Sequence, residues 1–277
     1  MQRHRRAVKL GMVQGAYAKR SLTDKFKLLR KLGFDGVELP SPNRYSTSEV
    51  LEAMAASKIE IPGVVNSAHW HARLNDPSPK VRSKGIAALE TALRDAGAYG
   101  ASTALLVPGV VDKAHDYEQC YRLSQECIRQ VLPLARELQV QVAVENVWNN
   151  FLLSPLELAR YLDEFESPWI GAYFDVGNVV RSGWPEQWIR TLRHRILKID
   201  VKEYHRRRRT FQVPLLEGDC DWPAVMRALH EVGYRGWFTA EVQGGGVDAL
   251  LEIRKRMDQI LELAPRRVRR AERLQAP

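Results

Sequence analysis

The sequence predicts an α/β protein that folds as a (β/α)8 barrel, and three observations support this prediction. Eight short apolar runs alternate along the chain with longer amphipathic stretches. The apolar runs show little polar alternation, which is typical of parallel strands that are covered on both faces. The chain has 277 residues, and eight strand–helix units within about 260 residues is the usual content of such a barrel.

The predicted strands are rich in Val, Ile, Leu and aromatic residues. In chain order they cover residues 8–13, 35–39, 60–65, 103–107, 140–145, 170–174, 196–201 and 236–241. A doubly wound open sheet is the alternative arrangement. However, no Gly-x-Gly-x-x-Gly motif follows the first predicted strand, which argues against the dinucleotide-binding form of that fold.

Amphipathic segments between these strands predict eight helices. They cover residues 21–32, 46–57, 80–96, 117–138, 154–164, 185–193, 222–232 and 247–263. Ser21 with Asp24 is close to a capping box at a helix start. Gly33, Gly97 and Gly233 stand where helix C-caps are expected. We therefore expect a single barrel domain over residues 1–263, followed by a basic tail at 264–277.

Composition excludes several classes of protein. Apolar residues make up 45% of the chain, and no stretch approaches the 18 apolar residues of a membrane span. Cys120 and Cys127 lie seven residues apart on one predicted helix, about 10.5 Å along its axis, which is too far for a disulfide. The basic N-terminus has no apolar region behind it, unlike a signal peptide. These features predict a cytoplasmic protein with reduced thiols and no membrane partner.

The formal net charge of +9 is concentrated in three segments. They are the N-terminus, residues 206–209 and the C-terminal tail, and the rest of the chain is slightly acidic. A nucleic-acid-binding surface would be expected to form a continuous patch or stripe. Solvated basic segments are the simpler interpretation, so no nucleic-acid partner is predicted.

Carboxylates stand at the ends of the last four predicted strands. Glu145 ends the fifth strand, Asp175 follows the sixth, Asp200 lies near the end of the seventh, and Glu241 ends the eighth. In this fold the C-terminal ends of the strands build the active site. One such acid could simply cap the next helix, but four that converge on one rim repel each other unless a cation compensates. An all-oxygen set suits Mg²⁺ or Mn²⁺.

The same segments resemble a known family. The stretches VENVWNNF (144–151), YFDVGNVV (173–180), ILKIDVKEY (196–204) and FTAEV (238–242) resemble the sugar isomerase/epimerase superfamily of xylose-isomerase-like barrels. Residues 33–43 and 66–70 fit its second and third strands. The resemblance covers roughly residues 8–263.

This resemblance implies a metal site. Ketose 3-epimerases of the superfamily hold one divalent metal with Glu, Asp, His and Glu on strands five to eight. By position, Glu145, Asp175 and Glu241 match, whereas Asp200 stands where those epimerases have His. Either Asp200 is the third ligand, which we favour, or His205 substitutes for it. The expected cofactor is one Mn²⁺ or Mg²⁺ ion.

The implied function is a metal-dependent isomerase or epimerase of a small-molecule sugar or sugar phosphate. Glu145 and Glu241 would act as acid and base on the two sides of a substrate carbon, through an enediolate. Return of the proton to the opposite face of the same carbon gives epimerisation, and return to the adjacent carbon gives isomerisation. The sequence does not separate these two outcomes.

Four further residues are predicted to contact substrate. His69 follows the third predicted strand, and Lys202 lies two residues after Asp200 on the same side of its strand. Asn178 stands where the family often has His, and Arg206 matches a family Arg. The segment 202–220 is the predicted lid.

Phosphate binding at the glycine run 244–246 is a weaker expectation. The oligomeric state is left open, and a homo-oligomer is compatible with the sequence.

The sequence leaves two alternative functions open and argues against a third. A polyol dehydratase of the same superfamily would share the metal and the enolisation step. A non-catalytic sugar-binding barrel is kept open by the Asp at position 200. An endonuclease-IV-like phosphodiesterase needs many histidines, but the chain has seven. Four of these fall outside the predicted strand ends: His4, His115, His194 and His230.

Overall fold

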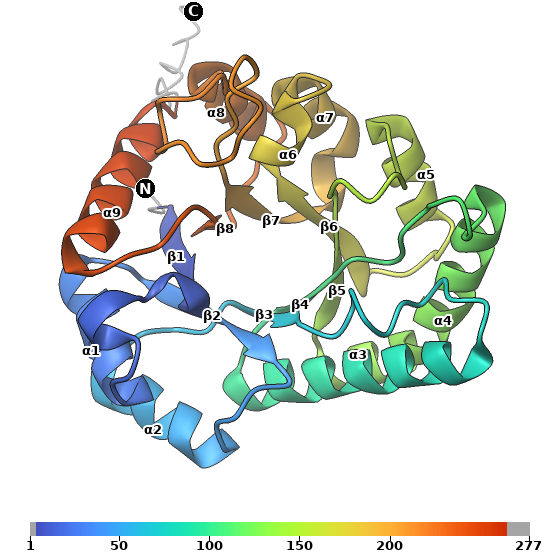
Figure 1. The fold of residues 1–277 in the computed structure, drawn as a ribbon, viewed down its shortest axis with the longest axis horizontal. Coiled ribbons are helices and arrows are strands. Elements are labelled where there is room, and N and C mark those ends of the chain that lie inside the picture. The colour runs from blue at the N-terminus through green and yellow to red at the C-terminus, as the bar shows by residue number, and fades with distance from the viewer. Residues whose placement is uncertain (1–3, 265–277) are drawn as a thin grey trace, which may run out of the picture.

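The computed structural model describes residues 4–264, and in it eight parallel strands close into a barrel (Figure 1). Each strand pairs with its neighbours in the sequence, and the first pairs with the last. This arrangement confirms the predicted (β/α)8 barrel. The strands are β1 (Arg5–Lys9), β2 (Gly36–Ser41), β3 (Gly63–Asn66), β4 (Thr103–Leu106), β5 (Gln141–Glu145), β6 (Ile170–Asp175), β7 (Ile196–Val201) and β8 (Trp237–Ala240).

Helices surround the barrel as an outer ring (Figure 1). They are α1 (Leu22–Leu32), α2 (Thr47–Ser57), α3 (Pro79–Tyr99), α4 (Tyr117–Leu138), α5 (Pro155–Asp163), α6 (Val176–Val180), α7 (Pro185–Leu192), α8 (Trp222–Glu231) and α9 (Val247–Glu262). All eight predicted helices are present. The short helix α6, directly after β6, was not predicted. The described elements run from Arg5 to Glu262, and the predicted basic tail lies outside the described residues from 265 onward.

The first strand is the main error in the sequence-based prediction. It was predicted at 8–13, but β1 ends at Lys9 and a 3-10 turn, Leu10–Met12, follows it. Leu10 and Met12 are buried, so an apolar run continues beyond the strand and hides its end. As a consequence, Lys9 lies at the rim of the barrel rather than near the start of a strand.

Two smaller corrections concern the third strand and one helix end. The third strand was predicted at 60–65 and lies at Gly63–Asn66. Gly97 was expected to cap α3, but that helix continues to Tyr99, and Gly100 adopts the left-handed conformation (φ 71°) that ends it. Ser21 caps α1 as predicted, because its side chain accepts a hydrogen bond from the Asp24 amide.

A buried ion pair fills the centre of the barrel. Lys198 on β7 bonds to Glu38 on β2, and both side chains are fully buried. Tyr173 donates a hydrogen bond of 2.8 Å to the second carboxylate oxygen of Glu38, and Thr239 donates one of 3.2 Å to the first. At Gly63 a Cβ atom would lie 2.7 Å from the Lys198 ammonium. A glycine is therefore required there for the lysine to fit.

The three cysteines, Cys120, Cys127 and Cys220, are free thiols. Within residues 4–264, no helix has both the length and the apolar character needed to cross a membrane.

We predict that Lys198→Met lowers the free energy of unfolding by about 3–5 kcal/mol, because it leaves the Glu38 carboxylate buried without its cation. Urea denaturation measures the change. The double variant Lys198→Met/Glu38→Gln should recover most of the loss. Arg122→Met, which removes an exposed pair with Glu126 on α4, is the control and should cost less than about 1 kcal/mol. An equal loss in both single variants would contradict the prediction.

Candidate active site

Four carboxylates converge at the C-terminal mouth of the barrel. They are Glu145, Asp175, Asp200 and Glu241, from the ends of β5 to β8, and each offers an oxygen within 4.8 Å of the others. The first three side chains are buried and Glu241 is half-buried. The convergence follows from the fold, since parallel neighbouring strands present their C-terminal ends to the same rim.

Two lysines contact this carboxylate cluster. Lys9 on β1 bonds to Asp200 Oδ2 at 2.7 Å and also to Glu241 Oε2. Lys202, just after β7, lies 2.8 Å from Glu241 Oε1 and 3.2 Å from Asp175 Oδ2. Both Glu241 oxygens therefore contact an ammonium group.

The donor set of the cluster fits a divalent cation. Asp200 Oδ1 and Asp175 Oδ2 are buried and accept no hydrogen bond of good geometry, although Lys202 lies near the latter. Four carboxylates against two ammonium groups leave a formal charge of −2. Buried carboxylates without partners are costly, and a hard divalent cation such as Mg²⁺ or Mn²⁺ would match both the charge and the oxygen donors.

The two glutamates of the cluster have pKa values shifted in opposite directions. Burial, reinforced by the charge of Glu241, raises the pKa of Glu145 to about 8. Burial also opposes ionisation of Glu241, but the ammonium groups of Lys9 and Lys202 outweigh it and lower the pKa of Glu241. A pair of carboxyl groups whose environments separate their pKa values in this way can supply a proton acceptor and a proton donor.

Asparagines hold Asp175 in place. Asp175 Oδ1 accepts a hydrogen bond from the backbone N–H of Asn178 and thereby caps α6. The other oxygen, Oδ2, faces the cluster. Asn146 clamps the Asp175 backbone with two hydrogen bonds. The Asn178 side chain in turn donates to the Asn146 carbonyl at 2.9 Å. The side-chain amide of Asn178 thus has a protein partner. The predicted contact of Asn178 with substrate stays a prediction.

His69 is buried and neutral at the mouth. The backbone amide of Val107 donates to its Nδ1 at 3.3 Å, so the remaining ring proton belongs on Nε2. Burial, together with the nearby charge of Lys9, lowers the pKa of His69 to about 4. A neutral imidazole with its proton on Nε2 is a hydrogen-bond donor suited to a hydroxyl or carbonyl oxygen.

Buried Glu203 anchors the segment that was predicted to be a lid. Its carboxylate accepts hydrogen bonds from the backbone of Leu216 and Cys220 and from the Trp222 indole. Gly218 packs against Glu203 so closely that a Cβ atom would lie 2.5 Å from its side chain. These contacts tie the segment down over its second half.

Arg206 ties the same segment to α6. Its guanidinium donates to the carbonyls of Val180 and Gly183 at 2.8 and 2.9 Å. Its predicted substrate contact stays a prediction. His205 faces Asp219 on this segment and is not part of the carboxylate cluster. The structure thus groups Asp200, and not His205, with the other three carboxylates, and its role as a metal ligand stays a prediction.

An aromatic group borders the site beside Lys202. Phe211 lies 4.8 Å from the Lys202 ammonium and 4.6 Å, between ring centres, from Trp148. The Trp148 indole donates to the Asn178 carbonyl at 2.8 Å. The segment after β7 thus places the Phe211 ring over the Lys202 ammonium, which contacts the carboxylate cluster.

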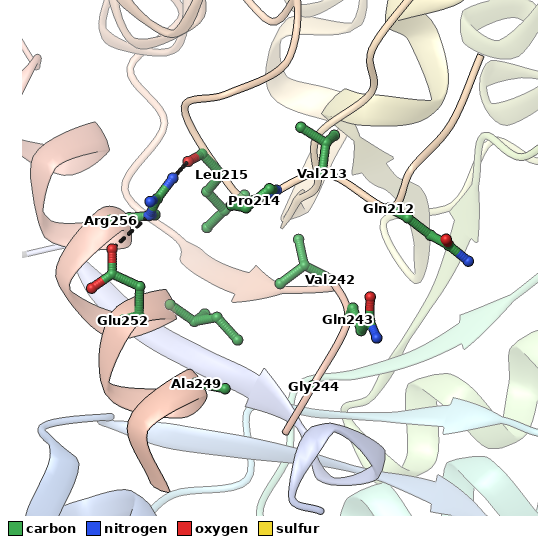
Figure 2. Close-up of a pocket in the computed structure, with 11 residues that line it drawn as sticks. Gln212, Val213, Pro214, Leu215, Val242, Gln243, Gly244, Ala249, Glu252 and Arg256 are labelled. Carbon is green, nitrogen blue, oxygen red and sulfur yellow. Dashed lines mark hydrogen bonds and ion pairs between the residues drawn. The ribbon is translucent and has the colours of Figure 1, made fainter. Parts of the chain in front are cut away.

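A cavity of about 290 Å³ lies next to the strand end that carries Glu241 (Figure 2). Its walls come from three segments: residues 212–215, residues 242–244 and one face of α9. Arg256 at one end is bonded to the Leu215 carbonyl and to the Glu252 carboxylate (Figure 2). The guanidinium of Arg256 is thus already paired with protein oxygens.

Three residues of the site were not singled out from the sequence. Asn146 and Glu203 position loops through contacts that no local pattern reveals. Lys9 did carry a signal, since it is a lone lysine in an apolar run. The misplaced end of the first strand concealed its location at the rim.

We predict that Mn²⁺ affinity rises with pH until about pH 8. Below its pKa of about 8, Glu145 is protonated, and a metal must displace that proton, so affinity should fall about tenfold per pH unit. Isothermal titration calorimetry in buffers of different ionisation enthalpy measures the affinity and the proton release. Glu145→Gln should bind more weakly and show a shallower pH dependence. An unchanged pH slope in that variant would contradict the assignment.

Comparisons with known proteins place this site in a family context. Among curated proteins, the chain is 28% identical over 254 residues to the Escherichia coli K12 protein named "Putative L-ribulose-5-phosphate 3-epimerase SgbU", covering 84% of this chain and 88% of the relative. It is 23% identical over 253 residues to L-ribulose-5-phosphate 3-epimerase UlaE of Escherichia coli O1:K1 / APEC, covering 86% and 88%.

Solved structures show the same fold. A D-tagatose 3-epimerase-like protein matches with a TM-score of 0.80 at 16% identity, over 94% of this chain and 97% of its own. An L-ribulose 3-epimerase matches with a TM-score of 0.79 at 14% identity, over 94% and 95%. The family model described as xylose isomerase-like TIM barrel matches residues 26–264. The protein therefore belongs to the xylose isomerase-like TIM barrel family.

Proposed function

We propose that the chain is a divalent-metal-dependent epimerase that inverts C3 of a ketose or ketose phosphate in the cytoplasm. One observation carries the proposal: carboxylates from four consecutive strands meet within 4.8 Å at the mouth of a barrel of this family. The names of curated relatives, L-ribulose-5-phosphate 3-epimerases, support the choice of C3 epimerisation.

Glu145, Asp175, Asp200 and Glu241 would hold the metal ion. When bound, a divalent cation polarises a substrate carbonyl and its neighbouring hydroxyl, which acidifies the proton on the carbon beside that carbonyl. The buried oxygens of Asp175 and Asp200 that have no hydrogen-bond partner support their role as ligands.

Glu241 and Glu145 would exchange the proton at C3. Lys9 and Lys202 favour the ionised form of Glu241, so it carries no proton at the start and would be the group that removes the one on C3. Burial raises the proton affinity of Glu145, so of the two glutamates it would be the one that carries the proton returned to C3. Since the two glutamates come from β5 and β8, they would approach C3 from different sides, and removal on one face with return on the other inverts the carbon through an enediolate.

Four residues would contribute to substrate binding: His69, Lys202, Asn178 and Arg206. The ammonium of Lys202 contacts Glu241 and Asp175 of the cluster, and His69 has its proton on Nε2. Asn178 and Arg206 already have backbone partners. Their contribution would come from holding α6 and the segment after β7 as walls of the site.

We predict C3-specific exchange with solvent. Mn²⁺-loaded protein in D₂O is offered ketoses and ketose phosphates, including L-ribulose 5-phosphate, and NMR follows the label. Deuterium at C3 with appearance of the 3-epimer is expected. Glu145→Gln and Glu241→Gln should each lower kcat by about 10²–10⁴-fold, whereas the surface variant Glu126→Gln should match the wild type.

Other outcomes of this assay identify the alternatives. Label at C1 or C2 with an aldose product would indicate an isomerase, and loss of water would indicate a dehydratase. Metal binding without exchange of any substrate would indicate a sugar-binding barrel that does not turn over.

Arg206→Ala should raise KM by about tenfold with a smaller change in kcat, because it releases the segment after β7 from α6. Arg208→Ala is the matched control, since this exposed neighbour makes no side-chain bond to α6. Steady-state kinetics on the best substrate of the panel measures both. Equal effects of the two changes would instead indicate a diffuse electrostatic role for the arginine run.

A further inference from the structure

We propose that Lys9 is the positioning residue for Asp200, so that the two residues act as one unit in the metal site. In this unit Asp200 is one carboxylate ligand, and the Lys9 ammonium offsets the negative charge of that carboxylate. This inference rests on the proposed metal site and identifies which residue allows a fourth carboxylate to work there.

The geometry gives the two oxygens of Asp200 different tasks. Oδ2 bonds to the Lys9 ammonium at 2.7 Å, and the Asp200 side chain is completely buried. Oδ1 is equally buried but has no hydrogen-bond partner. Lys9 thus fixes the orientation of the carboxylate while the other oxygen stays available for a cation.

Lys9 is itself fixed in position. It ends β1, where its Cα is paired in register with that of Glu38 on β2. Its ammonium lies 5.5 Å from the ring of Tyr173, and its side chain is only 17% exposed. Its carboxylate partners are Asp200 and Glu241. An ammonium group held this way acts as a fixed charge rather than a flexible surface lysine.

Charge arithmetic links the two positions. The cluster carries −2 with both residues present, and it would also carry −2 if both were neutral. Removal of the Asp200 charge alone leaves −1, which attracts a divalent cation less. Removal of the Lys9 charge alone leaves −3 and a buried Asp200 without its partner, which is costly. The two changes should therefore compensate each other.

Lys202 is a control that distinguishes a specific Lys9–Asp200 pair from an effect of total charge alone. It contacts Glu241 and Asp175, and its contacts do not include Asp200. Removing Lys202 changes the net charge by the same amount as removing Lys9. A specific Lys9–Asp200 unit predicts that only the loss of Lys9 compensates for a neutral residue at position 200.

The experiment compares wild type with Lys9→Met, Asp200→His, Lys9→Met/Asp200→His and Lys202→Met/Asp200→His. Histidine is chosen because it is a neutral ligand that Mn²⁺ also accepts. Mn²⁺ dissociation constants are measured by calorimetry, and Tm is measured for each metal-free protein. Neither measurement requires turnover.

Asp200→His alone should weaken Mn²⁺ binding by about tenfold or more, as the loss of one charge in a low-dielectric site implies. The Lys9→Met/Asp200→His protein should bind within about threefold of wild type, and the Lys202→Met/Asp200→His protein should stay weak. In the metal-free proteins, Lys9→Met should lower Tm, and adding Asp200→His should recover it.

Two results would overturn the inference. One is an additive cycle, in which Lys9→Met fails to rescue Asp200→His in affinity and in metal-free Tm. The other is equal rescue by Lys202→Met, which would show that only total charge matters. Failure of the wild type to bind Mn²⁺ would instead overturn the proposed function, and the metal-free Tm cycle would still test the pair.

Discussion

The structure depends on charge balance inside a narrow, mostly buried space. Four carboxylates lie within 4.8 Å of one another at the mouth, and a fifth, Glu38, lies in the barrel centre. Ionised groups this close and this dry repel strongly unless cations are placed among them. Lys198 pairs with Glu38 in the centre, and Lys9 and Lys202 pair with carboxylates at the mouth. A divalent cation would neutralise the formal charge of −2 that remains at the mouth.

Rigid loops preserve that balance, because a charge pair works only while its distances hold. The hydrogen bonds of Asn146 with Asp175 and with Asn178 fix the Asp175 turn, and the Glu203 carboxylate holds the segment after β7. These residues touch the site only through the residues they hold. They explain why polar side chains are buried around a mouth whose chemistry requires only a few ligands.

Members of one barrel family can act on different substrates because the strand ends and the loops have separate tasks. The strand ends of β5 to β8 carry the carboxylates that would do the chemistry. The surrounding walls, including Phe211 and the cavity beside Glu241, come from the loops and α9.

The sequence by itself determined the barrel, eight of the nine α-helices within residues 4–264 and the four carboxylates, because each follows from a local pattern: an apolar run, an amphipathic period, or an acid at a strand end. The tertiary structure decided that Lys9 pairs with Asp200, 191 positions away, and that Asn178 and Arg206 bond to backbone carbonyls. These contacts depend on the pairing of β1 with β8, which closes the barrel, and on the packing of loops that follow different strands. No local pattern contains that information, and one strand end misplaced by four residues was enough to hide Lys9.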